Sequence, residues 1–207
     1  MREYYVYDIP VFIVNEPPSD WVNIPSLCKE IEEFFPRALL KNIEVIYIGN
    51  FKNLEDRGSN AIYSNGAIYI TAAEPTNFDI LENFVHEVAH SLEQERGWEI
   101  YDEELQSEFL GKRRRLQSLL QAEGYEINPV LFNYLEYNRK FDEFLSQEVG
   151  YPTLQSLTTG LFVSPYGATS LQEYFANGFE NYFLEDPKVV RDISPVLYHK
   201  IERILND

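Results

Sequence analysis

The sequence predicts an α+β protein in which a small strand-rich part, residues 1–75, is followed by a mainly helical part, residues 76–207. Two observations carry this prediction. Short aromatic and β-branched runs lie in the first third of the chain, whereas helical spacing and glycine stops dominate from Thr76 onward. With 207 residues, of which 44% are apolar, both parts fit within a single domain that has a sizeable core.

Three stretches of the first third predict strands. Residues 3–14 have the aromatic and β-branched content of a strand, and Pro10 indicates an edge or a break in it. Residues 43–49 form a short apolar strand candidate, and residues 61–71 give two strand-like pieces around Asn65-Gly66. Because Asn-Gly between such pieces is a strong turn signal, we expect a hairpin there.

Apolar residues with helical spacing predict one helix in the first third and five in the rest of the chain. Two of the five lie in the segment of about 101–150, which we interpret as a helical insertion within the single domain. The predicted helices cover residues 24–40, with an interruption near Pro36, and then 76–97, 102–124, 128–150, 169–186 and the residues after Ser194.

The charge balance excludes several classes of partner. The 17 basic and 34 acidic residues give a net charge of −17, which repels nucleic acid and anionic lipid, so we expect neither partner. No apolar run is long enough to cross a bilayer, and no basic start followed by an apolar run indicates a standard signal peptide. We therefore expect a cytoplasmic protein, with export by another route left open. The one cysteine, Cys28, fits a reducing compartment.

The only basic cluster is Lys112 to Arg115. We expect it to lie on the surface, paired with the acidic first turn of its own helix or with neighbouring acidic residues.

The stretch "NFVHEVAHSLEQE", residues 83–95, holds two of the three histidines in the chain. On a helix, His86 and His90 lie one turn apart on one face and can direct two imidazole nitrogens at one zinc ion. Glu87 lies about 100° around the helix, where it can act as a general base without being a ligand. Chance alone gives the pattern in roughly one of 200 sequences of this composition, so we predict a catalytic zinc site.

A catalytic zinc ion has three protein ligands and one open position. His199, the remaining histidine, is expected to have a surface or capping role on the last helix. A carboxylate is then the third ligand, and Glu173 is the best candidate. The local pattern leaves an alternative open, because Ser170 to Glu173 also forms a capping box in which Glu173 bonds to a backbone N–H.

The run "VSPYGATSLQEYFANGFENYFLEDP", together with "HEVAH", resembles the glutamate-zincins of the anthrax lethal factor, Mlc titration factor and Pro-Pro endopeptidase type. This resemblance implies a zincin-like fold and a zinc-dependent peptidase that acts on a peptide or protein substrate. It implies that His86, His90 and Glu173 bind one zinc ion, that Glu87 is the base, and that Tyr166 supports the transition state.

The resemblance also implies two features around this site. The strand before the metal helix is expected at the edge of the cleft, where an extended substrate pairs with it. Asn177 stands where many relatives have a carboxylate that orients a ligand histidine, so an uncharged group is expected to do so here. The alternative is a catalytically weak or inactive zincin-fold protein that acts as a structural or regulatory partner, and the oligomeric state is not indicated. The expected edge strand consists of Ala67, Ile68, Tyr69, Ile70 and Thr71.

Overall fold

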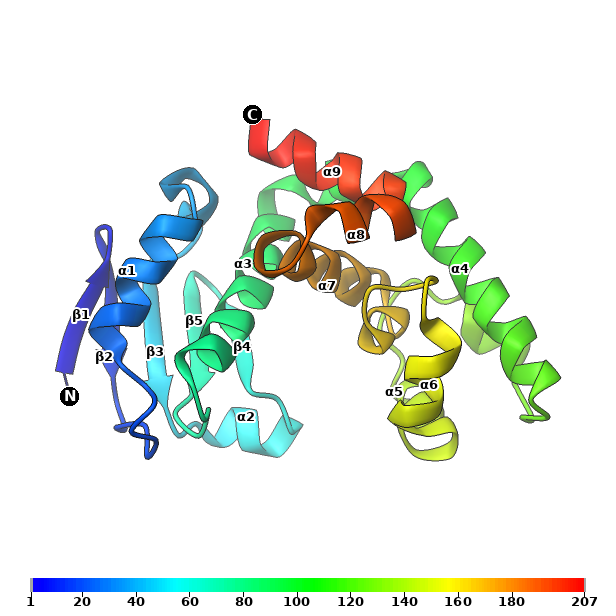
Figure 1. Cartoon of the computed structure of the whole chain (residues 1–207), viewed down its shortest axis with the longest axis horizontal. Coiled ribbons are helices and arrows are strands. Elements are labelled where there is room, and N and C mark those ends of the chain that lie inside the picture. Colours follow the sequence, from blue (N-terminus) through cyan, green and yellow to red (C-terminus); the bar gives the residue numbers. More distant parts are fainter. Residues whose placement is uncertain (1, 207) are drawn as a thin grey trace. The chain divides into compact units, whose positions relative to one another are not determined.

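The chain folds into an α+β protein with a five-stranded mixed sheet; Figure 1 shows the computed structural model, which describes residues 2–206. The described residues form two compact units. The sheet unit extends to Gln94, and the helical unit begins at Glu95. The sequence predicted that the strand-rich part ends at residue 75. In the structure, most of the long helix that follows this residue belongs to the sheet unit.

The sheet has the strand order β1-β2-β3-β5-β4. The two outer pairs, β1–β2 and β4–β5, are antiparallel, and the pairs β2–β3 and β3–β5 are parallel. The strands are β1 (Arg2–Val6), β2 (Ile9–Ile13), β3 (Val45–Gly49), β4 (Ala61–Ser64) and β5 (Ala67–Thr71).

Residues 3–14 do not form the single strand that their composition predicted. A two-residue turn at Tyr7 and Asp8, with Tyr7 at φ 53°, divides them into the β1–β2 hairpin. Pro10 lies inside β2, opposite Tyr5, but the parallel pairing with β3 begins only at Val11. Its missing N–H therefore costs no ladder bond on that side.

The hairpin predicted at Asn65-Gly66 is confirmed. Both residues have positive φ, 49° and 82°, as a type I′ turn requires, and they join β4 to β5.

Two helices, α1 (Ile24–Phe34) and α3 (Asn77–Ile100), lie over one face of the sheet in the sheet unit (Figure 1). The short helix α2 (Lys52–Arg57) and the 3-10 turn η1 (Arg37–Leu40) connect strands and helices, and Pro36 interrupts the first helix as expected. The apolar stripe predicted on α3 is confirmed, since its members are at most 2% exposed; they are Ile80, Phe84, Val88 and Leu92.

Helix α3 continues beyond Gly97, where the sequence predicted its end. Gly97 is helical and its carbonyl accepts a hydrogen bond from the N–H of Tyr101. Ile100 is completely buried, so packing of the last turn outweighs the weak helix propensity of one glycine.

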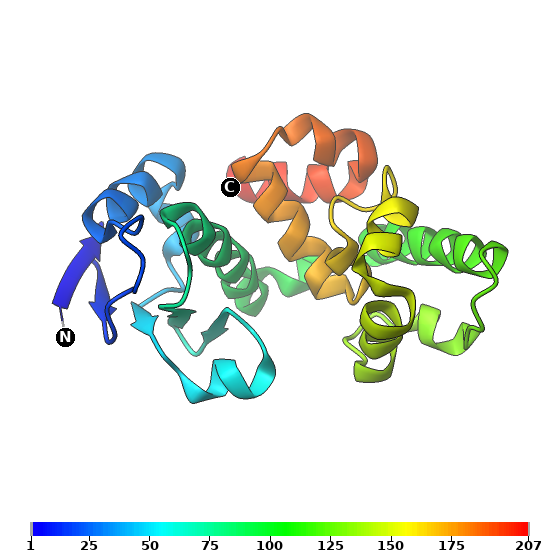
Figure 2. The same ribbon diagram turned by 60° about the horizontal axis from the view of Figure 1, so that its bottom comes forward.

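The helical unit is divided into more pieces than the sequence predicted (Figure 2). Residues 128–150 form a 3-10 turn, a loop, a short α-helix and a π-helix in place of one helix, and the helices α6 and α8 were missed. Beyond α3, the elements are α4 (Glu103–Ala122), η2 (Pro129–Asn133), α5 (Arg139–Glu143), η3 (Phe144–Gly150), α6 (Tyr151–Thr158), η4 (Pro165–Ala168), α7 (Leu171–Leu184), α8 (Pro187–Ile193) and α9 (Pro195–Asn206).

The prediction that the basic cluster of Lys112 to Arg115 lies on the surface is wrong for its first two members. Lys112 and Arg113 are 8% and 0% exposed, whereas Arg114 and Arg115 are exposed. Nζ of Lys112 donates to the carbonyls of Leu161 and Ile193 at 2.7 and 2.6 Å. These two cations are thus internal hydrogen-bond donors.

Within residues 2–206, no helix combines the length and the apolar character that a membrane span requires.

Candidate metal centre

The two histidines of the HExxH motif meet on the surface of α3 within the sheet unit. Their Nε2 atoms are 3.2 Å apart, and both side chains are partly buried. Two nitrogens that bind zinc at 2.0–2.1 Å and a tetrahedral angle lie about 3.3 Å apart. The pair therefore fits two neighbouring positions of a tetrahedral ion. The same distance also suits a hydrogen bond in which one imidazole donates to the other, so spacing alone does not require a metal.

Glu93 fixes the orientation of the second histidine. Its Oε1 lies 2.6 Å from Nδ1 of His90, one helical turn along α3, and its side chain is 17% exposed. A carboxylate at that distance accepts the Nδ1 proton, which leaves the Nε2 lone pair of His90 available as a ligand. Metal-binding histidines in proteins usually have such a partner, and the sequence analysis missed this one.

Glu87 is buried at 6% exposure and is held by the sheet. Its Oε2 accepts a hydrogen bond of 2.5 Å from the backbone N–H of Tyr63 in β4. The Tyr63 ring extends this connection, because its hydroxyl donates to the carbonyl of Asn42 at 3.1 Å. Strand β4 thus positions the carboxylate that the sequence identified as the base.

The prediction that residues 67–71 form a sheet edge is wrong. Strand β5 pairs with β3 on one side and with β4 on the other, so the edge on this side is β4. The N–H of Thr71 bonds to the carbonyl of Asn60, so Ala61 and Tyr63 point their backbone groups outward. Two of these outward groups already have partners, since Ser59 donates to the Ala61 carbonyl and the Tyr63 N–H donates to Glu87.

Glu173 lies in the first turn of α7, within the helical unit. Ser170 is the N-cap of this helix, and its hydroxyl accepts from the N–H of Glu173 at 3.1 Å. The Ser170 half of the predicted capping box is therefore present. Because Ser170 provides a cap from its own side chain, the helix start is stabilised without requiring the carboxylate of Glu173.

Tyr166 lies in the turn η4, directly before α7, and is 36% exposed. Burial and then the negative charge of Glu173 raise the pKa of its phenol above the ordinary value. The hydroxyl therefore remains protonated at neutral pH and is a hydrogen-bond donor. Since the charge of Glu173 contributes to this shift, the two side chains lie within electrostatic range of each other in the helical unit.

Asn177 is buried one turn after Glu173, but its side-chain NH₂ group donates to the backbone carbonyl of Glu173 at 2.8 Å. This bond within α7 uses one of its donor hydrogens. Asn177 thus bonds to the backbone of its own helix. That it orients a ligand histidine stays a prediction.

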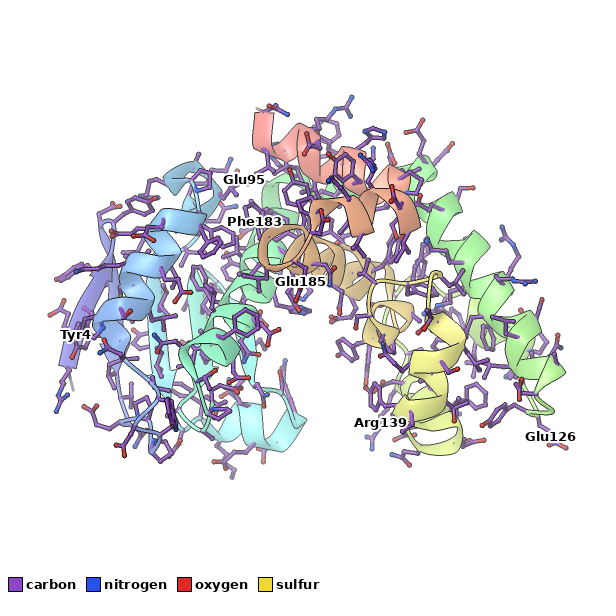
Figure 3. The ribbon with its side chains drawn as sticks, viewed as in Figure 1. Tyr4, Glu95, Glu126, Arg139, Phe183 and Glu185 are labelled. Carbon is purple, nitrogen blue, oxygen red and sulfur yellow. The ribbon has the colours of Figure 1, made fainter. Side chains whose placement is uncertain are left out.

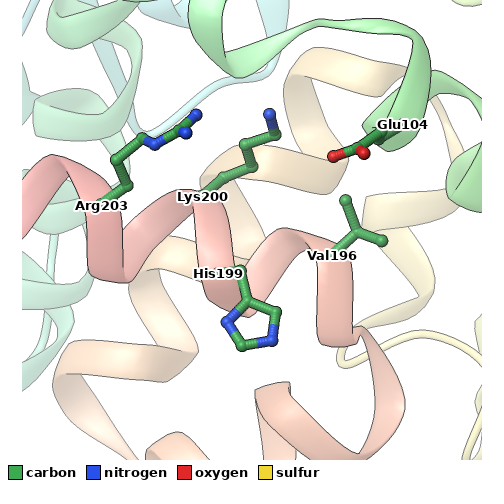
Figure 4. Close-up of a pocket in the computed structure, with 5 residues that line it drawn as sticks. All are labelled: Glu104, Val196, His199, Lys200 and Arg203. Carbon is green, nitrogen blue, oxygen red and sulfur yellow. The ribbon is translucent and has the colours of Figure 1, made fainter.

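His199 is exposed on α9, which confirms its predicted surface placement. Figure 4 shows a hollow beside it in the helical unit, where the imidazole points away from Lys200 and Arg203. Nζ of Lys200 bonds to Asp102, and Nε of Arg203 lies 3.7 Å from Glu99. These cations already have carboxylate partners, so the hollow has neither the donors nor the free charge of a second metal or anion site.

The thiol of Cys28 is buried, and burial raises its pKa to about 11. It is therefore protonated at neutral pH and unreactive as a nucleophile.

Comparison of the chain with protein-family models, with curated proteins and with solved structures finds no match. The class of protein therefore has to be inferred from the residues of the site and their chemistry.

Proposed function

We propose that this protein is a zinc-dependent metallopeptidase of the glutamate-zincin type. In this proposal, His86, His90 and Glu173 hold one zinc ion, and the substrate is a peptide or protein. Each of the three side chains is partly buried and offers one imidazole nitrogen or carboxylate oxygen, a ligand set that suits zinc. A zincin-like fold is part of the same proposal, since the α+β architecture with a mixed sheet is compatible with it.

The arrangement of α3 is the observation that carries this proposal. Two Nε2 atoms at a spacing suited to one ion, with a carboxylate on the outer nitrogen of His90, form a ligand pair that is oriented in advance. A structural zinc site does not need a base, whereas Glu87 stands next to the first ligand and is held by a backbone N–H. This additional carboxylate favours catalysis over a purely structural site.

The proposed chemistry divides between the ion and the chain. Zinc supplies Lewis-acid activation of water and of the scissile carbonyl. The carboxylate of Glu87 takes the proton from the attacking water and passes it to the leaving amine. The phenol of Tyr166 donates a hydrogen bond to the oxyanion as negative charge develops there.

Metal analysis tests the ligand set. The purified full chain is expected to contain about one zinc ion per chain, and the double variant His86→Ala, His90→Ala is expected to contain none. Stoichiometric zinc in that variant would contradict the assignment of the ligands. If the wild-type chain binds no zinc at any accessible concentration, the imidazoles form a hydrogen-bonded pair and the proposal fails.

The variant Glu87→Gln tests whether the site is catalytic. Because Gln keeps the size and the acceptor oxygen but cannot take a proton, zinc content is expected to remain near that of wild type. Digestion of a peptide library is expected to slow by about 10² to 10⁴. A chain that binds zinc but cleaves no peptide, with or without this change, would instead support the non-catalytic alternative.

A further inference from the structure

The buried guanidinium of Arg113 in α4 binds two segments of the helical unit that are distant from it in sequence. Its Nη1 donates to the carbonyl of Leu131 at 3.0 Å, and its Nη2 donates to that of Thr169 at 2.6 Å. The ring centroids of Phe109 and Phe141 lie 4.9 and 4.1 Å from its Cζ. Figure 3 shows side chains that fill the space between α4 and its neighbours α6 and α7. Two rings and two carbonyls thus fix the direction of this cation.

Thr169 connects this cation to the turn η4. Its hydroxyl and its N–H both donate to the carbonyl of Tyr166, at 2.7 and 2.9 Å, and the residue is 3% exposed. The carbonyl of Thr169 is the group that accepts from Arg113. Three hydrogen bonds that share one residue therefore join the backbone of Tyr166 to α4.

The turn η4 also lies against the first turns of α7. A Cβ atom at Gly167 would be 3.6 Å from Cβ of Asn177 and 3.8 Å from the carbonyl oxygen of Glu173, which is ordinary van der Waals contact. Because the turn rests on α7 at this place, a shift of the turn moves Tyr166 relative to Glu173, one of the proposed zinc ligands.

A buried cation without a carboxylate partner is unfavourable unless its acceptors are well placed. Burial lowers the pKa of Arg113 to about 9, and within the described part of the chain no carboxylate opposes this shift. An apolar side chain would fill the same space without the desolvation of a charge. The reason for a cation here is therefore the pair of carbonyls that it binds, and of the two, the carbonyl of Thr169 leads directly to Tyr166.

We propose that Arg113 and Thr169 are positioning residues, which together hold Tyr166 in place for catalysis. The proposal rests on the proposed peptidase function and on the role of Tyr166 within it. A hydrogen-bond donor stabilises an oxyanion only when it is held at bonding distance from the place where the charge develops. The segment of about 101–150, which carries Arg113, thus contributes to turnover through the turn η4 and without contact with the substrate.

The variants Arg113→Met and Lys112→Met form a matched pair for the test. Both remove a buried cation of α4 that donates to two backbone carbonyls, but Lys112 reaches Leu161 and Ile193 and not the turn. A purely structural role predicts similar consequences of both changes, whereas a positioning role predicts that only Arg113→Met alters the turn. Both are made in the full chain and studied at a temperature at which circular dichroism shows them to be folded.

Hydrogen exchange reports on the turn without zinc and without cleavage. The N–H groups of Gly167 and Thr169 close η4 through backbone hydrogen bonds. Loss of a hydrogen bond from a charged donor is expected to speed the exchange of these two amides by at least about tenfold in Arg113→Met. In Lys112→Met, their exchange is expected to stay within about twofold of wild type.

Turnover of one cleaved peptide shows whether these residues act through Tyr166. For Arg113→Met, kcat is expected to fall by about tenfold with little change in KM, since the bond to the oxyanion forms only in the transition state. In the Tyr166→Phe background, the same change is expected to have no further effect on kcat, because the hydroxyl that it positions is absent. A further loss in that background, or an equal loss in Lys112→Met, would overturn the proposal.

If Arg113→Met fails to fold, Thr169→Val replaces it. Valine keeps the shape but lacks the hydroxyl that bonds to the Tyr166 carbonyl, so kcat is expected to fall by about fivefold, and Thr169→Ser is expected to restore it. Faster exchange of the turn without loss of kcat, in a chain that cleaves peptides, removes the positioning role and keeps the peptidase. A chain that cleaves no peptide removes the peptidase and the positioning role with it.

Discussion

The sheet unit and the helical unit satisfy their buried polar groups in different ways. In the sheet unit, four strand pairings provide partners for the strand backbone, and side-chain bonds to the backbone come from several different elements, as at Tyr7, Asn42 and Glu87. In the helical unit, charged side chains from one face of α4 reach the ends of several other elements. Arg113 donates to the carbonyls of Leu131 and Thr169, and Lys112 donates to those of Leu161 and Ile193.

A third residue of the same helix completes this pattern. The carboxylate of Glu108 accepts from the hydroxyl of Tyr174 and from the first N–H groups of α9, at Val196 and Leu197. Short helices leave many terminal N–H and C=O groups without intrahelical partners. In the helical unit, three charged side chains of the single helix α4 supply partners for such groups. In the sheet unit, the side chains that do so are spread over several elements.

The largest effect is expected for Arg113→Met. Methionine fills much of the same volume but leaves the carbonyls of Leu131 and Thr169 without donors, and it loses the contacts of the guanidinium with Phe109 and Phe141, at 4.9 and 4.1 Å from the ring centroids. Burial lowers the pKa of Arg113, so removing the charge offsets part of the loss. We expect the free energy of unfolding to fall by about 3–5 kcal/mol, measured by urea denaturation.

The neighbouring residue provides the control. Arg114 is exposed on the same helix, so Arg114→Met is expected to change the free energy of unfolding by less than about 0.5 kcal/mol. Equal losses in the two variants would mean that α4 does not organise the unit through its buried face.

The same difference explains which parts of the fold could be predicted from the sequence. The β4–β5 hairpin follows from Asn65-Gly66, and the α3 stripe follows from helical spacing, because both are local patterns. The breakup of residues 128–150 could not be predicted, since the loop and the π-helix there depend on tertiary packing around Phe132 and Phe141. The order of the strands is equally non-local, and the wrong expectation that β5 is an edge came from the resemblance and not from a pattern in the sequence.

The residues of the candidate site also differ in whether a local pattern could predict their contacts. The spacing of His86 and His90 is set by one helix and was predictable. Glu93 could have been found by the same rule, because residues three apart on a helix are neighbours. The bond from the Tyr63 N–H to Glu87 joins a strand to a helix, and no local pattern signals it. The role of Glu173 rested on the local pattern and on a resemblance, and that of Tyr166 rested on the resemblance alone; both stay predictions.

Tyr166→Phe tests whether the helical unit takes part in the proposed chemistry. Within residues 2–206 the Tyr166 hydroxyl makes no hydrogen bond that would stabilise the fold, and its side chain is 36% exposed. We therefore expect the free energy of unfolding and the zinc content to be unchanged. Removal of one oxyanion donor typically costs about 2.7–4 kcal/mol in the transition state. The loss is expected to fall about equally on kcat and kcat/KM, measured on one cleaved peptide. An unchanged rate would leave Tyr166 as a loop residue without a catalytic role.

Glu93→Gln tests the corresponding part of the sheet unit. The amide can still contact Nδ1 of His90, but it no longer strengthens the imidazole as a ligand. Zinc affinity is expected to fall by about 10- to 100-fold, measured by competition with a chromophoric chelator. Gln94→Ala, an exposed change at the next position, is the control and is expected to have no effect on affinity. A zinc affinity of Glu93→Gln equal to that of wild type would show that the contact between Glu93 and His90 has no effect on metal binding.

The smallest effect concerns a close contact between two helices of the helical unit. A Cβ atom at Gly178 of α7 would lie 2.2 Å from Cδ2 of Leu197 in α9, so α7 and α9 approach each other closely there. At Gly111 of α4 the nearest atom to such a Cβ, in the side chain of Arg114, is 3.8 Å away. Both glycines are helical and gain the same propensity from alanine, up to about 1 kcal/mol.

Contacts between the helices therefore decide whether each substitution raises or lowers the free energy of unfolding. Gly111→Ala is expected to raise the free energy of unfolding by up to about 1 kcal/mol, because nothing has to move. For Gly178→Ala, the shift of Leu197 costs about 1–3 kcal/mol and outweighs the propensity gain, so a net loss of about 1–2 kcal/mol is expected in urea denaturation. If Leu197→Ala restored none of that loss in the double variant, the contact between α7 and α9 would not be its cause.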